Sequence, residues 1–173
     1  MAIREIVLYP DAPLTQKAAP VEGVGALLAS LVEDLWDSMY EFDGVGLAAP
    51  QIGVSQRVLV LHNPEDDREL CLVNPELSEC EGNQVGPEGC LSLPHIEAEV
   101  PRYERVRVRA FDPDGSPLDF VAEGFLARII QHECDHLDGV VFLDRLDILS
   151  REDKYQEWMA VREQLLAAPD GKV

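Results

Sequence analysis

The sequence contains little positive charge. Its 173 residues include 14 Lys or Arg against 33 Asp or Glu, which gives a formal net charge of −19. Only Lys17, Lys154 and Lys172 are lysines. A surface of this sign repels phosphate backbones and anionic lipid headgroups. The composition therefore excludes DNA and membrane surfaces as expected partners.

Long apolar runs are also absent. No segment approaches the ~20 consecutive apolar residues that cross a bilayer, and residues 1–5 lack the apolar run of a signal peptide. Hydrophobic residues still make up 46% of the chain, which is enough to build a core. The length indicates one domain, expected over residues 1–173, and we expect it to be cytoplasmic.

The four cysteines form no CxxC pair. Cys71 and Cys80 lie in strand-like segments and are expected to be reduced thiols, in the core or half-buried. Cys134 lies two residues from His132, on the opposite side of the helix expected there, so we expect it to pack in the core.

The stretch from His132 to His136 is the strongest chemical signal. Its two histidines stand four residues apart, and on a helix this spacing places both imidazoles on one face, where they can share a metal ion. Glu133, beside the first histidine, is placed for proton exchange with a metal-bound water rather than for ligation. Because a metal lowers the pKa of bound water to about 7, the stretch predicts metal-assisted hydrolysis of a carbonyl compound.

A catalytic site of this kind needs a third protein ligand. The longer HExxHxxGxxH pattern is excluded, because Phe142 occupies the position of its third histidine. Glu157 is the one carboxylate placed as in a thermolysin-like site, but its surroundings resemble an ordinary amphipathic helix. Cys90, in the segment EGCLS, is the better candidate, because a thiolate is a strong ligand for zinc or ferrous iron.

The segment GVGLAAPQ, residues 44–51, is rich in small residues, too rich for a core strand. Glycine and alanine let a backbone lie close to a site. Gln51 at its end brings an amide N–H that can stabilise an oxyanion.

These three segments, GVGLAAPQ, EGCLS and QHECDHLDG, closely resemble in sequence and order the three motifs of the peptide deformylases. The resemblance runs from about Tyr9 to Leu146, most of the chain. It implies metal ligation by Cys90, His132 and His136. It also implies that Glu133 is the general acid and base, and that Gln51 and the backbone N–H of Leu91 stabilise the oxyanion.

The family removes the formyl group from N-formylmethionyl peptides as they are made, releasing formate. The resemblance therefore implies a divalent metal, Fe²⁺ in preference to Zn²⁺, Ni²⁺ or Co²⁺. Two other interpretations stay open, an HExxH metallopeptidase and a non-catalytic metal-binding paralogue. The intact Glu133 and Gln51 argue against the paralogue, since a binding module needs neither.

The resemblance also indicates where a substrate lies. Phe125 and Ile129 share a helix face with the two histidines and form an apolar wall, which Val45 would continue. Gly46 and Gly89 leave room for the substrate backbone.

Two further positions decide how closed this pocket is. Gly86 offers no side chain, so the wall there is expected to be open or rebuilt by neighbours. Arg128 is expected to line the pocket with its stem and reach solvent with its head. His95 is expected in a loop, and His62 at the end of a strand.

The order of elements predicts an α+β fold in one compact domain, with antiparallel or mixed sheets packed around a central metal-binding helix. We expect helices at 24–40, 124–137 and 150–167, and strands at 57–62, 70–74, 76–81, 100–111 and 118–122. Residues 150–173 carry four basic and five acidic side chains. Docking on the ribosome through this non-basic helix is therefore not expected.

Overall fold

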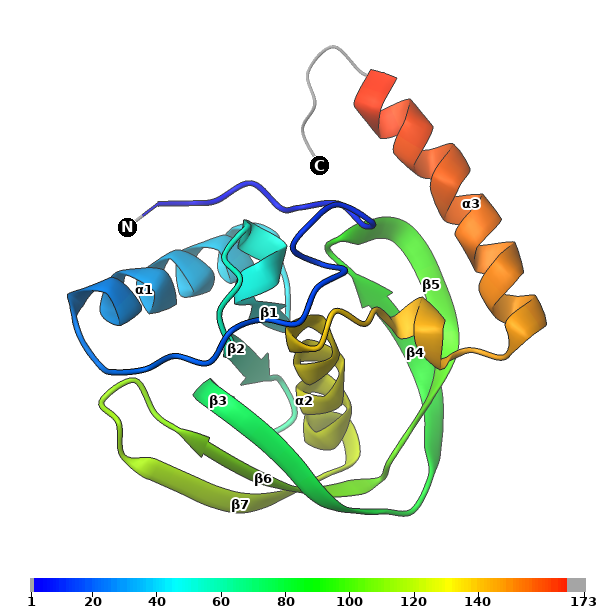
Figure 1. The fold of residues 1–173 in the computed structure, drawn as a ribbon. Coiled ribbons are helices and arrows are strands. Elements are labelled where there is room, and N and C mark those ends of the chain that lie inside the picture. The colour runs from blue at the N-terminus through cyan, green and yellow to red at the C-terminus, as the bar shows by residue number, and fades with distance from the viewer. Residues whose placement is uncertain (1, 168–173) are drawn as a thin grey trace.

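Helix α2 (Gly124–Leu137) lies at the centre of the molecule, in a computed structural model that describes residues 2–167 (Figure 1). All twelve residues from Leu126 to Leu137 are buried. Helix α2 therefore presents apolar side chains to the core and polar ones to a buried site. Buried polar groups need partners, so the fold around α2 must supply them.

Two antiparallel sheets surround α2. The larger has the strand order β1-β2-β3-β6-β7, and the smaller pairs β4 with β5. The strands are β1 (Gly46–Ala48), β2 (Val58–Asn63), β3 (Arg68–Glu81), β4 (Gln84–Cys90), β5 (Leu93–Arg102), β6 (Arg105–Phe111) and β7 (Pro117–Glu123). Short 3-10 helices follow β1 and α2, η1 (Ala49–Ile52) and η2 (Phe142–Arg145). This arrangement confirms the α+β prediction.

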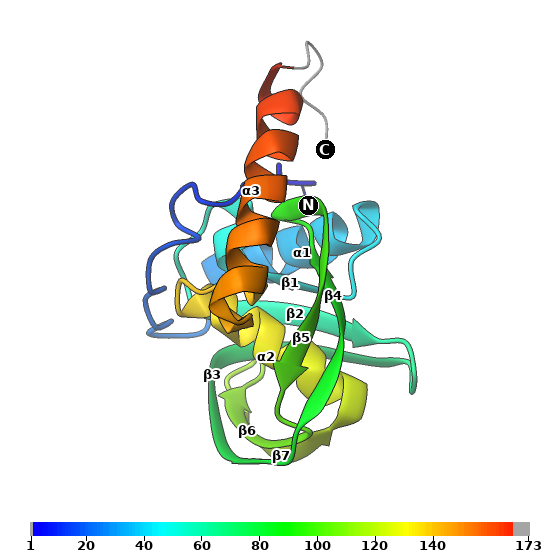
Figure 2. The ribbon, with the colours of Figure 1, turned by 90° about the vertical axis from the view of Figure 1, so that its right-hand side faces the viewer.

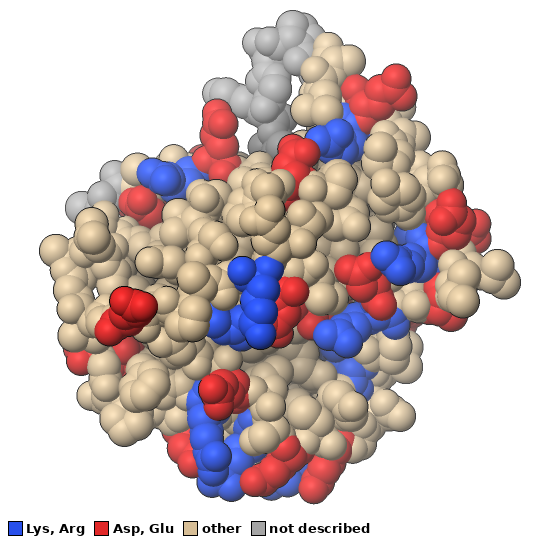
Figure 3. All heavy atoms as spheres, in the orientation of Figure 1, with Lys and Arg blue, Asp and Glu red and all other residues tan. Residues whose placement is uncertain are grey.

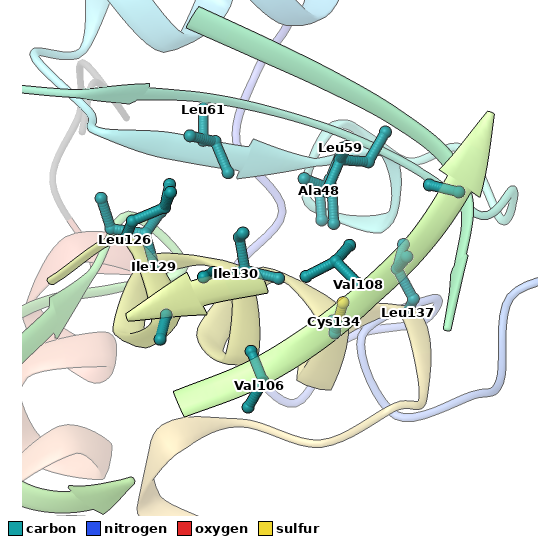
Figure 4. Packing of buried hydrophobic residues seen from close by; sticks show 14 residues of the cluster. Ala48, Leu59, Leu61, Val106, Val108, Leu126, Ile129, Ile130, Cys134 and Leu137 are labelled. Atoms are coloured by element: carbon teal, nitrogen blue, oxygen red, sulfur yellow. The ribbon is translucent and has the colours of Figure 1, made fainter. Parts of the chain in front are cut away.

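Strand β2 connects two parts of the core by simple alternation. Leu59 and Leu61 face α2, as Figure 4 shows, and join a cluster with Ile130 and Val108. Val58 and Val60 face the other way and pack with helix α1 (Ala26–Glu41). Successive strand residues point to opposite faces, so one apolar strand can serve both helices.

Helix α3 (Ile148–Ala167) lies at the edge of the molecule and packs against β5 and η2, through Trp158 and the partly buried Met159, Val161 and Leu165 (Figures 1 and 2). Trp158 is its one buried residue. The indole N–H of Trp158 donates to the carbonyl of Tyr9 at 2.9 Å. Asp170 and Lys172, counted above in the charge of this segment, lie outside the described residues.

Several predicted strands are wrong in their limits. The two strands expected at 70–74 and 76–81 are one strand, β3, whose register shifts between Val73 and Glu76, next to Asn74 with φ 52°. The strand expected at 100–111 is broken after Arg102, and its halves belong to different sheets. Strand β4 was missed, because its Gly and Pro residues do not resemble a strand. Pro87 is tolerated there because β4 pairs with β5 alone among the described strands.

The expectation that GVGLAAPQ holds no core strand is also wrong. Gly46, Leu47 and Ala48 form β1, and all three are buried against β2. The small size of Gly46 and Ala48 lets α2 lie close to this strand, whereas Leu47 packs in the cluster with α1.

Charged side chains of both signs are interspersed on the face in Figure 3. Arg107 lies 2.8 Å from Asp119 and 3.0 Å from Glu79, and Arg105 pairs with Glu123 at 3.2 Å. Exposed pairs like these contribute little stability. Within residues 2–167, no helix has the length and apolar character needed to cross a bilayer.

Candidate metal centre and active site

The three predicted metal ligands converge. His132 and His136 stand one turn apart on α2 with ring centroids 5.1 Å apart, and Cys90 ends strand β4. Cys90 Sγ lies 3.3 Å from His136 Nε2. One donor atom from each of the three residues falls within 4.8 Å of the others, and no other described group of His, Cys, Asp or Glu does so.

A carboxylate that the sequence did not single out fixes the first histidine. His132 Nδ1 donates to Glu88 Oε2 at 2.8 Å, which leaves Nε2 for a metal. Burial would raise the pKa of Glu88, but hydrogen bonds from His132 and Arg102 lower it to about 2. Glu88 is therefore a permanent anion behind His132.

Glu88 belongs to a buried ionic network. Arg102 donates to both Glu88 oxygens, at 2.8 and 3.0 Å, and to Asp135 at 2.6 Å. Arg145, half exposed, donates to the same Asp135 at 2.5 and 3.1 Å. This network pairs Glu88, Arg102 and Asp135, whereas Arg128 Nη2, Glu133 Oε2 and His136 Nδ1 on α2 have no hydrogen-bond partner among the described residues. Removing one partner of a buried ion pair is costly.

The site fits a cation. Burial and the nearby His132 lower the pKa of His136, so His136 is in the neutral form that binds metals. Burial would also lower the pKa of His132, but Cys90 and Glu88 raise it well above its usual value. The negative groups that favour a proton on His132 also favour a metal ion there.

Glu133 is buried beside the ligands and lines the same cavity. A Cβ on Gly46 would lie 2.5 Å from Glu133 Oε1, so β1 approaches the carboxylate as closely as only glycine permits. Glu133 Oε2 has no hydrogen-bond partner among the described residues. Burial raises the pKa of Glu133 to about 7, which suits a group that must both take and give a proton near neutrality.

Gln51 is held in a fixed orientation by the turn from β1 into η1. The backbone N–H of Ala48 donates to Gln51 Oε1 at 2.9 Å. The amide Nε2 therefore points into the site, 3.5 Å from Cys90 Sγ and 3.3 Å from Ser92 Oγ. Leu91, directly after β4, lines the same cavity.

The cavity has a volume of about 450 Å³. All five residues predicted to contact substrate line it: Val45, Gly46, Gly89, Phe125 and Ile129. His95 lines it too, from strand β5 rather than from the loop expected. His62 does lie near the end of β2, as predicted.

Arg128 lines the cavity, as expected, but the expectation for its head is wrong. Its head does not reach solvent, since its side chain is only 6% exposed and Nη1 lies 2.8 Å from Glu88 Oε1. The guanidinium fills the space that Gly86 leaves, where a Cβ would lie 3.3 Å from Nη2. The pocket is therefore closed at Gly86.

Glu157, the alternative third ligand considered from the sequence, is not among the converging donors. Glu157 lies on α3 and pairs with Lys154 at 2.8 Å. Phe142, at the position of the missing third histidine, packs against the ring of His132 at 6.1 Å between centroids. Cys134 is buried in the α2 core cluster, as expected, and Cys71 is half-buried, whereas Cys80 is exposed.

Known proteins resemble this chain along most of its length. The family described as "Polypeptide deformylase" matches residues 3–152. The peptide deformylase of Acidobacterium capsulatum is 48% identical over 157 residues, covering 88% of this chain and 91% of that protein. The crystal structure of the peptide deformylase from Thermus thermophilus is 44% identical with a TM-score of 0.88, covering 96% of this chain and 100% of that one.

A class I type b peptide deformylase from Acinetobacter baumannii, bound to Met-Ala-Ser, is 36% identical with a TM-score of 0.79. The match covers 84% of this chain and 99% of that one. A family match over most of the residues and relatives above 40% identity agree with the convergence of the three motifs. This chain belongs to the polypeptide deformylase family, hydrolases that act on an N-formyl amide.

Proposed function

We propose that this chain removes the formyl group from N-formylmethionyl peptides as they are made, with Cys90, His132 and His136 holding its metal. The convergence of these donors with Glu133 in one cavity is the observation that carries the proposal. We further propose that residues 1–173 act as one catalytic domain in the cytoplasm, where such peptides are made.

Fe²⁺ is the proposed metal, with Zn²⁺, Ni²⁺ or Co²⁺ as replacements. One thiolate and two imidazoles suit both iron and zinc, so the preference for iron rests on the family. When bound, the ion would supply water of lowered pKa and polarise the formyl oxygen.

Glu133 is the proposed proton carrier. Its buried carboxylate, with a pKa near 7 and one oxygen without a hydrogen bond, takes the proton of the attacking water. It then gives that proton to the amine nitrogen that leaves. Cleavage of the C–N bond of the formyl amide yields formate and a free amino terminus.

Gln51 and Leu91 are the proposed stabilisers of the formyl oxygen as it gains negative charge. The Gln51 amide is oriented in advance by the Ala48 N–H, so it needs no rearrangement during the reaction. One such donor is worth about 3–4 kcal/mol in the transition state.

The peptide backbone is proposed to lie between two strand edges. In the described part of the chain, β1 pairs only with β2 and β4 only with β5, and both strands line the cavity. An extended peptide can add to such edges through backbone hydrogen bonds. Gly46 and Gly89 leave room for it, and the Acinetobacter relative bound to Met-Ala-Ser supports a peptide ligand.

The methionine side chain is proposed to pack against Phe125 and Ile129 on α2, with Val45 opposite. These residues line the cavity and are apolar, which suits a thioether chain. Docking on the ribosome through α3 is not part of the proposal, because that helix is not basic.

Formate release from a formyl-Met dipeptide tests the proposal. The protein as purified anaerobically should release formate, lose activity with a chelator and regain it with Fe²⁺. Cleavage of an internal peptide bond without formate would indicate the metallopeptidase, and metal binding with neither reaction the paralogue. Full activity in anaerobically purified protein that carries only zinc would contradict the iron assignment.

A further inference from the structure

Arg128 is a buried cation whose hydrogen bonds all come from one nitrogen. Its Nη1 lies 2.8 Å from Glu88 Oε1, 2.9 Å from the carbonyl of Val100 and 3.3 Å from the carbonyl of Gly86. Gly86 and Val100 face each other in the register of β4 and β5. One side chain of α2 therefore contacts both strands of the small sheet at a single level.

This position matters because the metal ligands come from different elements. His132 and His136 belong to α2, whereas Cys90 belongs to β4. The distance between the thiolate and the imidazoles is therefore set by how α2 sits on β4. Arg128 lies one helical turn before His132 and ties that part of α2 to β4 close to its ligand.

Arg128 also acts on His132 through Glu88. Glu88 Oε1 accepts from Arg128 and from Arg102, and Oε2 accepts from Arg102 and from His132 Nδ1. Arg102 is shared with Asp135, so Arg128 is the cation that serves Glu88 alone among the network's carboxylates. Held in this way, Glu88 fixes the plane of the His132 imidazole through Nδ1 and leaves Nε2 available to a metal.

The absence of a side chain at Gly86 gives the Arg128 guanidinium its space. A Cβ at residue 86 would lie 3.3 Å from Arg128 Nη2, a tight contact that needs a small shift, and at ordinary contact distances of 3.5 and 3.6 Å from Cζ and Nε. Gly86 thus makes room for the contacts of Arg128 with Glu88 and the two strands, and does not open the substrate pocket.

We propose that Arg128 is a positioning residue for the metal centre, which it orders by holding Glu88 against His132 and α2 against β4. Its place in the cavity wall is secondary to this role. The inference rests on the metal assignment proposed above, and it assigns Arg128 no contact with the reacting atoms.

Metal affinity measured with Arg128→Met tests this role. Metal-free protein is titrated with Zn²⁺ in competition with a chromophoric chelator. We expect the dissociation constant to rise about tenfold, the lower end of the ~10–100-fold range for outer partners of metal ligands, because Arg102 still holds Glu88. In the Zn²⁺-loaded enzyme kcat should fall while KM for a formyl-Met peptide changes little.

Two further variants separate the role from general packing. Arg128→Lys should recover part of the affinity, since an ammonium can reach Glu88 but cannot also span both carbonyls. Arg109→Met, which removes an exposed arginine paired with Asp119, should leave affinity and kinetics unchanged. If Arg128→Met does not fold, Gly86→Ala provides the same test, with an expected rise of a few-fold.

The outcomes distinguish this inference from the proposed function. Unchanged Zn²⁺ affinity with a changed preference between formyl-Met and formyl-Ala peptides would make Arg128 a pocket wall only and overturn the inference. Failure of the unsubstituted protein to bind one Zn²⁺ per chain would overturn the metal assignment instead.

Discussion

At the scale of single residues, the site contains two buried carboxylates whose surroundings shift their pKa values in opposite directions. Glu88 and Glu133 are both buried carboxylates, yet the pKa of Glu88 is lowered to about 2 and that of Glu133 is raised to about 7. The difference follows from their partners. Glu88 accepts hydrogen bonds from two arginines and His132, whereas Glu133 Oε2 accepts none from the described residues. Environment thus gives two like residues separate tasks.

Glu133→Ala should keep the metal and lose turnover. Glu133 lies beside the ligands but is not one of the three converging donors, so binding should persist. Loss of a general acid and base lowers kcat by about 10²–10⁴-fold. The measurements are elemental analysis and formate release, with Glu157→Ala as the control expected to change neither. Near-normal turnover in Glu133→Ala would exclude the proposed role.

At the scale of elements, the site is a product of close packing between β1 and α2. Gly46 touches the Glu133 carboxylate, and Ala48 on the same strand orients Gln51. Strand β1 therefore helps to position both Glu133 and Gln51, the proposed proton carrier and oxyanion stabiliser. The small residues Gly46 and Ala48 therefore serve the proposed chemistry as well as the packing.

Gly46→Ala should displace Glu133 without removing a metal ligand. The added Cβ would lie 2.5 Å from Oε1, which no real contact tolerates, so the carboxylate or β1 must shift. Misplacement of a reacting group by about 1 Å can cost ~10²-fold in rate. We expect a loss of kcat of that order with metal content retained. Gly23→Ala, where a Cβ meets nothing within 4 Å, is the matched control. Equal kcat in both variants would show that β1 does not set the position of Glu133.

The sequence predicted the helices and the convergence of Cys90, His132 and His136 better than the strands and the ionic network, for physical reasons. His132 and His136 lie on one regular helix, so spacing alone places them. Strand β1 was missed because its small residues serve close approach rather than bulk burial. Arg102 and Asp135 come from separate segments and resemble ordinary surface charges, and only the fold shows that they meet.

At the scale of the whole molecule, helix α2 and strands of both sheets line the site cavity, while α3 packs against β5 in a third core cluster. Trp158 lies in that cluster with Phe142 and Leu93. Phe142 in turn packs on His132, so the docking of α3 is connected to the metal helix by direct contacts.

Trp158→Ala should destabilise the protein strongly. Trp158 is completely buried and its N–H is bonded to Tyr9, so truncation leaves a large cavity and an unpaired carbonyl. Substitutions of this kind cost about 3–5 kcal/mol. Urea unfolding measures the loss, and Leu166→Ala, on the exposed side of the same helix, should change the unfolding free energy by less than about 0.5 kcal/mol. A Trp158→Ala variant as stable as Leu166→Ala would show that α3 is not part of the folded core.

The closure of the cavity bears on how well the proposed pocket would select methionine. An apolar pocket discriminates by only about 1–3 kcal/mol, or roughly 10- to 200-fold in kcat/KM. Because the Arg128 guanidinium fills the gap at Gly86, the pocket is closed at a position where the sequence left an open and a rebuilt wall as alternatives. We therefore expect formyl-Met-Ala-Ser to exceed formyl-Ala-Ala-Ser toward the upper end of that range. Steady-state formate release from both peptides gives the ratio, and the same ratio measured with Val85→Ala, outside the cavity lining, is the control. Since both peptides share the formyl group and the downstream residues, equal kcat/KM values would mean that Phe125 and Ile129 form no side-chain pocket.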